Sequence, residues 1–244
     1  MVNNRHCYHK LSDQSILFIV IVVSSFCIFI FPSLDLIYGD DTNAGVSPIQ
    51  SNPFGHSYGE WVAKWWQWAY SIPKASNPVS DTTGLNCAVN QNGSIWFLAG
   101  TYGGSATRSC SIPSGKGIMF PIFNVEGAFA EEKGVQTEQE LRTMVRDYID
   151  KTTVLEASVD GQQLTNLKNY RVESPKFVFD YPEDNVVGLP AGTKSEAVSD
   201  GYWIILEPLS PGKHEIHFKG ANSQFTTTGI QNFATEVTYN LKVG

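Results

Sequence analysis

One aromatic stretch, Ser57–Ile72, constrains the fold more than any other part of the 244-residue chain. It contains four of the six tryptophans and reads SYGEWVAKWWQWAYSI. Ser57 and Glu60 have the spacing of a capping box, in which the hydroxyl and the carboxylate satisfy free amides at a helix start. Apolar residues then recur at helical spacing, and Pro73 disfavours a helical conformation in the residue before it. Each buried aromatic side chain removes roughly 150–250 Å² from water. The stretch therefore predicts a helix that either nucleates the core or presents aromatic residues to a ligand.

Within this predicted helix, we expect Trp61 and Trp65 to be core residues. The apolar side chains are spread over a wide helical face, and an exposed patch of that size is rare on soluble monomers. Trp68 is turned toward the flank that carries Lys64 and Gln67. It is the tryptophan that we interpret as free to contact a ligand or a partner.

The N-terminal segment predicts export. The run Ile16–Phe31 carries only two serines among apolar residues, with Arg5 and Lys10 before it and Asp35 and Asp40 after it. The run is longer than a typical signal-peptide core and slightly short of a comfortable membrane span. Residues 1–39 fit either a cleaved signal peptide or a retained membrane anchor. The charge asymmetry predicts that the rest of the chain lies outside the cytoplasm, either secreted or anchored to the cell membrane.

Composition divides the remainder into a polar linker, residues 40–52, and one β-rich extracytoplasmic domain, residues 53–244. The chain has a formal net charge of −7 and no run of lysine and arginine. We therefore do not expect nucleic acid as a partner.

The domain is predicted to be mainly β. Strands are expected near residues 87–89, 94–101, 117–125, 154–159, 162–164, 176–180, 201–209, 213–220 and 233–243. Thr137 and Glu140 form a second capping box, which predicts another helix up to about Lys151. Asn92-Gly93 is a hairpin signal. This pattern indicates an antiparallel β-sandwich, immunoglobulin-like or jelly-roll-like, with two appended α-helices and an N-terminal hydrophobic leader.

Two of the four cysteines, Cys7 and Cys27, belong to the leader. Cys87 and Cys110 remain outside the cytoplasm, where an even pair is best interpreted as a disulfide. Two cysteines without a CxxC motif make a poor zinc site.

Few residues suggest a catalytic, metal-binding or ligand-binding role. His214 and His217 are three residues apart in a predicted strand, so they point to opposite faces and do not form a zinc motif. A half-buried His214 bonded to a nearby loop is the favoured interpretation, with ligand binding as the alternative. Arg108 is a candidate for binding a carboxylate ligand through two parallel hydrogen bonds, although bonds to loop carbonyls are the simpler role. Neither a metal nor a cofactor is expected.

Asn92-Gly93-Ser94 matches the glycosylation sequon, but a tight hairpin turn also accounts for it. The carboxylates that could serve as an acid–base pair are scattered, and spacing alone brings no two of them together. They are Glu60, Asp81, Glu126 and Asp200.

Several stretches resemble a family of uncharacterised exported proteins of bacteria and archaea. The resemblance rests on the segment Trp96–Thr101 (WFLAGT), on the Gly103-Gly104, Arg108 and Cys110 loop, and on the C-terminal corner Pro208–His214 (PLSPGKH). It covers most of the chain from Gly55 to Val243. It implies export and a single domain, and it supplies no catalytic residues.

The sequence therefore favours a cell-surface binding or structural module, with a cell-envelope component or a glycan as its partner. The membrane becomes a further partner if the leader is retained. The alternative is a secreted hydrolase that acts on envelope polysaccharide or peptide. A cleft with two carboxylates, lined by tryptophan or tyrosine, would favour the enzyme.

Overall fold

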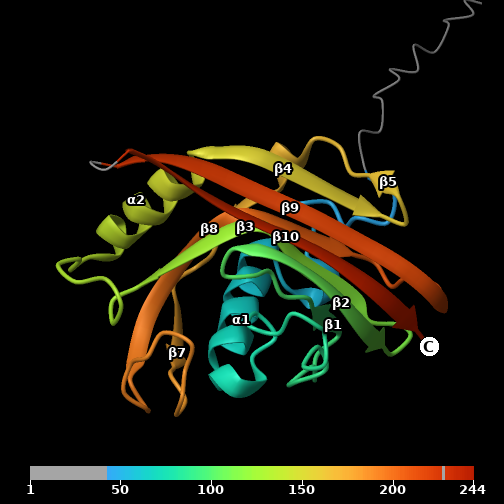
Figure 1. Ribbon diagram of the computed structural model, residues 1–244, viewed down its shortest axis with the longest axis horizontal. Helices are drawn as coiled ribbons and strands as arrows, with labels where there is room; N and C mark the ends of the chain where they lie inside the picture. Colours follow the sequence, from blue (N-terminus) through green and yellow to red (C-terminus); the bar gives the residue numbers. More distant parts are fainter. Residues whose placement is uncertain (1–42, 227–228) are drawn as a thin grey trace, which may run out of the picture. The chain divides into compact units, whose positions relative to one another are not determined.

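Two mixed five-stranded β-sheets form the body of the protein (Figure 1). The computed structural model describes residues 43–226 and 229–244, so the expected leader, residues 1–39, lies outside the described residues. In the first sheet the order is β1 (Ile95–Phe97), β3 (Gly117–Ala128), β8 (Lys194–Leu206) and β6 (Arg171–Glu173), with β7 (Phe177–Asp180) also paired to β8. In the second sheet the order is β2 (Gly104–Ile112), β10 (Gly229–Val243), β9 (Gly212–Thr226), β4 (Thr152–Val159) and β5 (Gln162–Gln163). No helix in these described ranges is both long enough and apolar enough to cross a bilayer.

The prediction of a mainly β fold with two helices is confirmed, but the sheets are mixed rather than antiparallel, because each contains one parallel pair. The chain leaves the first sheet after β1, forms β2 in the second sheet and returns as β3, so β1 and β3 run parallel. The last strand, β10, runs parallel to β2. Both strands of the second pair are regular, with Ala106 opposite Val237 and Cys110 opposite Leu241.

The strand β3 is apolar on both faces because it lies between two layers. Ile118 and Phe120 pack into the core shared with the second sheet, while Met119 packs into the core under α1. The register with β8 shifts between Pro121 and Phe123, which marks a β-bulge beside the proline.

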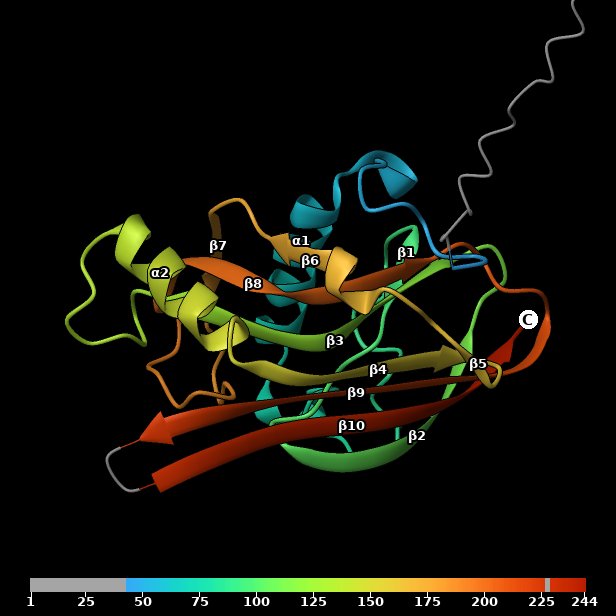
Figure 2. The same ribbon diagram turned by 90° about the horizontal axis from the view of Figure 1, so that it is seen from above.

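The helix α1 (Tyr58–Tyr70) forms a third layer on the outer face of the first sheet. Figure 2 shows β3 and β8 separated from β9 and β10, with α1 passing behind β8 and β3. The capping box of α1 is formed by Ser57 and Glu60, as predicted. Trp61 and Trp65 are buried, which confirms them as core residues, and Trp65 packs edge-on against Trp203 of β8. Three short 3-10 turns accompany the helices: Pro53–Gly55, Lys74–Ser76 and Leu167–Tyr170.

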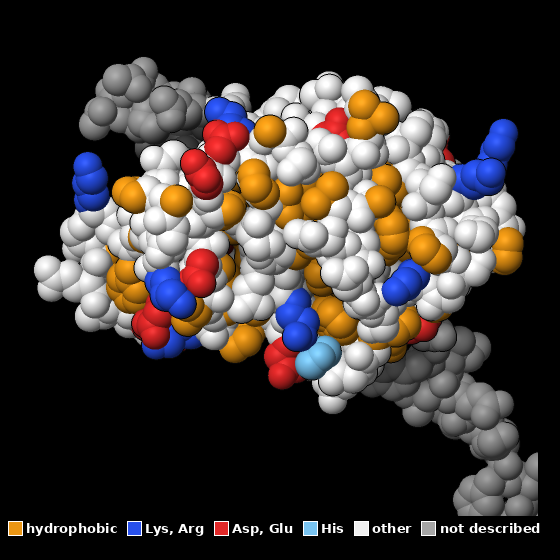
Figure 3. Space-filling view, turned by 90° about the horizontal axis from the view of Figure 1, so that it is seen from below, with side chains coloured by type: hydrophobic (Ala, Val, Ile, Leu, Met, Phe, Trp, Pro, Cys, Tyr) orange, Lys and Arg blue, Asp and Glu red, His pale blue; other side chains and the backbone are white. Residues whose placement is uncertain are grey.

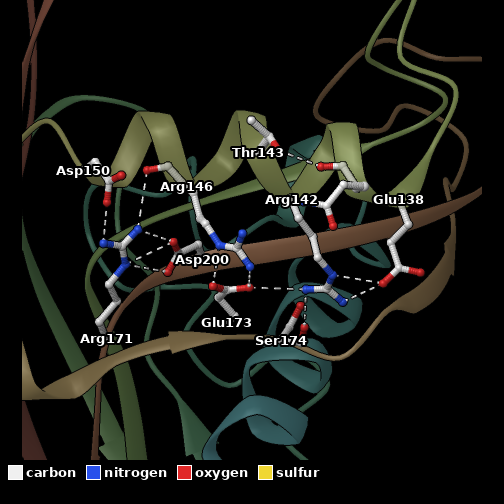
Figure 4. A network of polar contacts seen from close by, with 10 residues as sticks. Glu138, Arg142, Thr143, Arg146, Asp150, Arg171, Glu173, Ser174 and Asp200 are labelled. Carbon is white, nitrogen blue, oxygen red and sulfur yellow. Dashed lines mark hydrogen bonds and ion pairs between the residues drawn. The ribbon is translucent and has the colours of Figure 1, made fainter.

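The second helix, α2 (Glu138–Ile149), begins at the predicted capping box of Thr137 and Glu140. Its apolar residues Leu141 and Val145 pack on Val198 of β8. Figure 4 shows the ion-pair network that joins its polar side to β6 and β8. The main pairs are Arg171 with Asp200 and Asp150, Arg146 with Glu173, and Arg142 with Glu138.

The disulfide between Cys87 and Cys110 is confirmed, with a Cα–Cα distance of 5.9 Å. It ties an irregular loop to β2. The loop lies so close to this strand that a Cβ at Gly84 would come within 2.3 Å of the Ser109 carbonyl oxygen, and Gly84 has a positive φ of 92°. Only glycine suits such a position.

The predicted hairpin at Asn92-Gly93 is absent, because residues 85–90 form turns and β1 pairs with β3 instead. A strand was also missed: residues 104–112 were predicted as loop but form β2. In β2 the buried residues Ala106, Arg108 and Cys110 alternate with exposed serine and threonine.

Part of the expected linker belongs to the folded domain. Val46 forms a bridge with Leu206 at the end of β8, and the Ser47 amide donates to the Ile205 carbonyl oxygen. The side chain of Asn43 bonds to Thr165. Residues 45–47 are therefore held by the free backbone groups at the end of β8, and Asn43 is held by the loop that contains Thr165.

Candidate functional site

Arg108 is a buried structural residue, only 1% exposed. All five of its N–H groups are used. They donate to the carbonyl oxygens of Val79, Asp81, Ala99 and Gly100 and to the hydroxyl of Tyr239. The guanidinium has no donor left for a carboxylate ligand, so the simpler of the two predicted roles holds.

Trp68 is also buried, at 6% exposure, contrary to the expectation of a free flank. Its indole N–H donates to the Val89 carbonyl oxygen at 2.9 Å, and its ring packs against Phe97. The loop that carries the disulfide covers this side of α1, and the sequence offered no local signal of that long-range contact.

His214 is held between two partners, as the favoured interpretation proposed. Its Nδ1 lies 2.7 Å from Asp160 Oδ2, and its Nε2 lies 2.8 Å from the Ser210 carbonyl oxygen. The hydrogen bond to Asp160 raises the pKa of His214, against the effect of partial burial. His217 points to Glu236 on the other face of β9. In the part of the chain that the structure describes, no group of three or more His, Cys, Asp or Glu is placed to hold a metal ion.

Three of the four scattered carboxylates have structural partners. Glu60 closes the capping box of α1. Asp81 accepts from the amides of Thr83 and Asn86 and orders their loop. Asp200 is fully buried and accepts from Arg171, with 2.6 Å between Oδ2 and Nη2. Asn92 lies exposed in an open loop rather than in a hairpin, so its carboxamide faces solvent.

Glu126, the fourth carboxylate, lies at a pocket on the open edge of β3. β1 pairs with β3 only at Gly117–Met119, so the edge beyond Pro121 faces no strand of the described residues. A pocket of about 190 Å³ lies there, closed by α1, by the loop at Gly100–Tyr102 and by β10. Its aromatic lining consists of Trp65, Trp66, Tyr70, Tyr102, Phe123, Tyr148 and Phe233. We call it the β3-edge pocket.

The polar groups at this pocket are incompletely paired. Tyr70 donates its hydroxyl to Glu126 Oε1 at 2.8 Å. Glu126 Oε2 has no hydrogen-bond partner and no contact with solvent, and the same holds for Nδ2 of Asn124. Asn124 and Glu126 are two residues apart on β3, so they share the face toward α1. Unpaired buried polar atoms are rare in folded proteins and call for an explanation.

The electrostatic surroundings keep Glu126 protonated at neutral pH. Burial raises its pKa to about 8, with a further contribution from the charge of Glu131, while the bond from Tyr70 acts in the opposite direction. Burial also raises the pKa of Glu131, whose carboxylate accepts from the Tyr181 hydroxyl. Because Oε1 accepts from Tyr70, the proton of Glu126 belongs on Oε2.

A second, larger hollow of about 720 Å³ lies beside α2 and shares Val125, Glu126 and Tyr148 with the first. Charged side chains around it are mostly acidic, namely Glu132, Glu140 and Asp147, with Lys151 as the basic one. Figure 3 shows one face of the molecule, on which hydrophobic side chains gather in patches and charged ones are scattered.

Chemically, the β3-edge pocket combines an aromatic wall with one carboxyl group that can give or take a proton near neutral pH. Of its polar residues, sequence reasoning named only Glu126 and could not place it. A signal was nevertheless present, since Asn124 and Glu126 interrupt an apolar buried strand at a spacing of two. Their partners Tyr70 and Glu131 come from other parts of the chain and leave no local pattern.

Comparison of the chain with models of protein families, with curated proteins and with solved structures found no match.

Proposed function

We propose that this protein is an exported or membrane-tethered binding module that holds a small group of a cell-envelope component in the β3-edge pocket. The observation that carries the proposal is the pairing of an aromatic pocket with a buried carboxyl oxygen that has no partner. A pocket that combines apolar walls with a few convergent polar groups and a shifted pKa is the default binding-site hypothesis in an uncharacterised protein.

The size of the pocket supports binding of a small group rather than a whole polymer chain. Its volume of about 190 Å³ is below the roughly 300–1,000 Å³ of pockets for drug-sized ligands. The location outside the cytoplasm is supported by the disulfide of Cys87 and Cys110 and by the charges around the leader. The resemblance to exported proteins is consistent with the same location.

A glycine at the pocket provides a direct test. A Cβ at Gly100 would lie 3.6 Å from Pro121 and 3.9 Å from Thr235, which are ordinary contacts with two lining residues. Gly100→Leu should therefore fill the pocket without backbone strain. Gly93→Leu is the matched control, because a Cβ there meets only the backbone of Ile95.

The measurement is saturation-transfer NMR on the purified full chain with four probes: tetramethylammonium, tert-butanol, trimethylacetate and N-acetylglucosamine. At least one probe should bind saturably to the parent and to Gly93→Leu, and should lose binding in Gly100→Leu. If no probe distinguishes Gly100→Leu from the parent, the pocket is not the binding site.

The location has its own test. Protease added to intact cells or spheroplasts should remove an epitope placed after Gly244. Full protection of that epitope, beside a digested external control, would contradict export.

A secreted hydrolase remains the second candidate, and one observation favours it. A carboxyl group with a pKa near 8 suits a general acid at neutral pH, and Glu126 fits that description. Glu132, which lines the adjoining hollow, would be the second carboxylate. Hydrolysis of envelope polysaccharide or peptide that is abolished in both Glu126→Gln and Glu132→Gln would favour the enzyme over the binding module.

A further inference from the structure

We propose that the ligand group held in the β3-edge pocket is a small organic cation, of the size and shape of a quaternary ammonium group. This inference rests on the proposed function and names the chemical class of its ligand. Three properties of the pocket lead to it: the sign of the surrounding charges, the unpaired carboxyl oxygen and the aromatic walls.

The charges that act on Glu126 are acidic. They come from Glu131 and Glu132, and together with burial they disfavour a third negative charge in the pocket. None of the described residues that line the pocket is basic. Arg108 is a buried cation, but it directs its donors to the carbonyl oxygens of Val79 and Gly100 and to the hydroxyl of Tyr239.

Protonation therefore keeps Glu126 neutral, because no basic side chain among the described residues lines this pocket. Oε2 is covered in the pocket wall, but the terminal torsion of a glutamate side chain is soft, so a small rotation presents this oxygen to a ligand. A bound cation would replace the proton, leaving Glu126 ionised and paired by charge instead.

The aromatic walls suit the same ligand. Cations bind over the faces of tryptophan and tyrosine rings, and cages of such rings recognise quaternary ammonium groups. Trp66 and Tyr70 of α1 are buried in the wall, and Tyr102, which is 53% exposed, lies at the mouth. A quaternary ammonium group would pair with the ionised carboxylate by charge and with the rings by cation–π contact.

Proton replacement makes a quantitative prediction. Every binding event should release close to one proton below pH 8. The affinity should therefore fall about tenfold for each pH unit below about 8 and level off above it. The other titratable groups around Glu126 are tyrosines and acids from several elements. They are Tyr70 on α1, Tyr102 in the loop, Tyr148 on α2, Tyr181 after β7, and Glu131 and Glu132 after β3.

Three of the probes named above differ in charge and hardly in shape, so they test this inference directly. Titration calorimetry of the purified full chain should show tetramethylammonium binding at least tenfold more tightly than tert-butanol or trimethylacetate at pH 9. Tetramethylammonium does not titrate, so any pH dependence belongs to the protein. The proton release follows from comparing the heats in two buffers of different ionisation enthalpy.

Three variants test whether the preference for the cation and the pH dependence of binding arise from Glu126. Glu126→Gln should remove both the preference for the cation and the pH slope. Glu131→Gln should shift the slope to lower pH, because one of the charges that disfavour ionisation of Glu126 is gone. Glu156→Gln, at an exposed position of β4, makes the same change of charge elsewhere and should leave both unchanged.

Two results would overturn the inference: equal binding of tetramethylammonium and tert-butanol at pH 9, or cation binding that survives in Glu126→Gln. If a neutral or anionic probe binds instead and Gly100→Leu abolishes that binding, the cation is wrong while the binding function stands. If Gly100→Leu changes the binding of no probe, both proposals fail.

Discussion

Replacing Glu126 with glutamine should stabilise the protein at alkaline pH. The folded state raises the pKa of this carboxyl from its ordinary value of 4.5 to about 8. A carboxyl with a raised pKa binds its proton more tightly in the folded state than in the unfolded one. Its charged form is therefore penalised by folding, and stability is lost as the pH rises from the unfolded pKa through the folded one.

The size of the effect follows from the shift. Between about pH 5 and pH 8 the parent should lose up to about 1.4 kcal/mol of unfolding free energy per pH unit through this one group, and no more than about 5 kcal/mol in total. Glutamine keeps the shape and can still accept from Tyr70 at the position of Oε1. The variant should thus resemble the parent near pH 5 and exceed its stability by a few kcal/mol at pH 8.

The assay is urea denaturation of the parent and of Glu126→Gln, followed by tryptophan fluorescence at pH 5, 6, 7 and 8 with the disulfide intact. Groups that do not interact with Glu126, such as His214, cancel in the difference between the two proteins. Glu131 does interact with Glu126, so its titration contributes to the measured difference. Glu156→Gln serves as the control for net charge. A stability difference between the parent and Glu126→Gln that does not change with pH would refute the reasoning about this site.

Three further predictions concern the fold. Cys87 and Cys110 should both be unavailable to thiol labelling in the denatured, unreduced protein, and reduction should lower the unfolding free energy by about 3–3.5 kcal/mol, as measured by denaturation. Trp65→Ala should cost about 3–5 kcal/mol. Trp65→Phe should cost about 1–3 kcal/mol because it leaves the Leu98 carbonyl oxygen without its donor. If both variants were as stable as the parent, the helix would lie outside the core. Arg108→Lys removes two of five buried donors and should cost about 2–3 kcal/mol in the same assay, whereas an unchanged stability would contradict a structural role.

The elements that the sequence predicted well are those defined by local chemistry. Ser57 with Glu60, and Thr137 with Glu140, fix two helix starts because both partners lie within one turn. The strand near the C-terminus was predicted from its alternation of apolar and polar residues, and β10 shows that alternation from Val237 onward.

What the sequence could not provide was the pairing of distant segments. The parallel pairs of β1 with β3 and of β2 with β10 depend on which sheet each strand joins, and strand sequences do not encode that choice. Asn92-Gly93 gives the strongest local hairpin signal, yet tertiary contacts of β1 override it. β2 was missed because glycine, serine and threonine dominate its exposed positions. Trp68 was assigned to a free flank because the loop that covers it is distant in sequence.

The same distinction between local and long-range information applies to the candidate site. Glu126 is recognisable as an acid in a buried strand, but its role depends on Tyr70, Glu131 and the open edge of β3, and none of these is local. Three ionisable side chains of the interior, Arg108, Asp200 and Glu126, differ in how completely their surroundings satisfy them. Arg108 has five acceptors for five donors, and Asp200 has the guanidinium of Arg171.

Glu126 alone among these three keeps an oxygen without a partner, beside two further acids and an aromatic wall. Folding gains nothing from that arrangement, because a neutral side chain of the same shape would avoid the cost of burying an acid. Departures from local consistency are expected where function requires them. A bound cation would balance the charge of ionised Glu126 and contact the aromatic wall. Such a ligand accounts for this departure without any change in the surrounding residues.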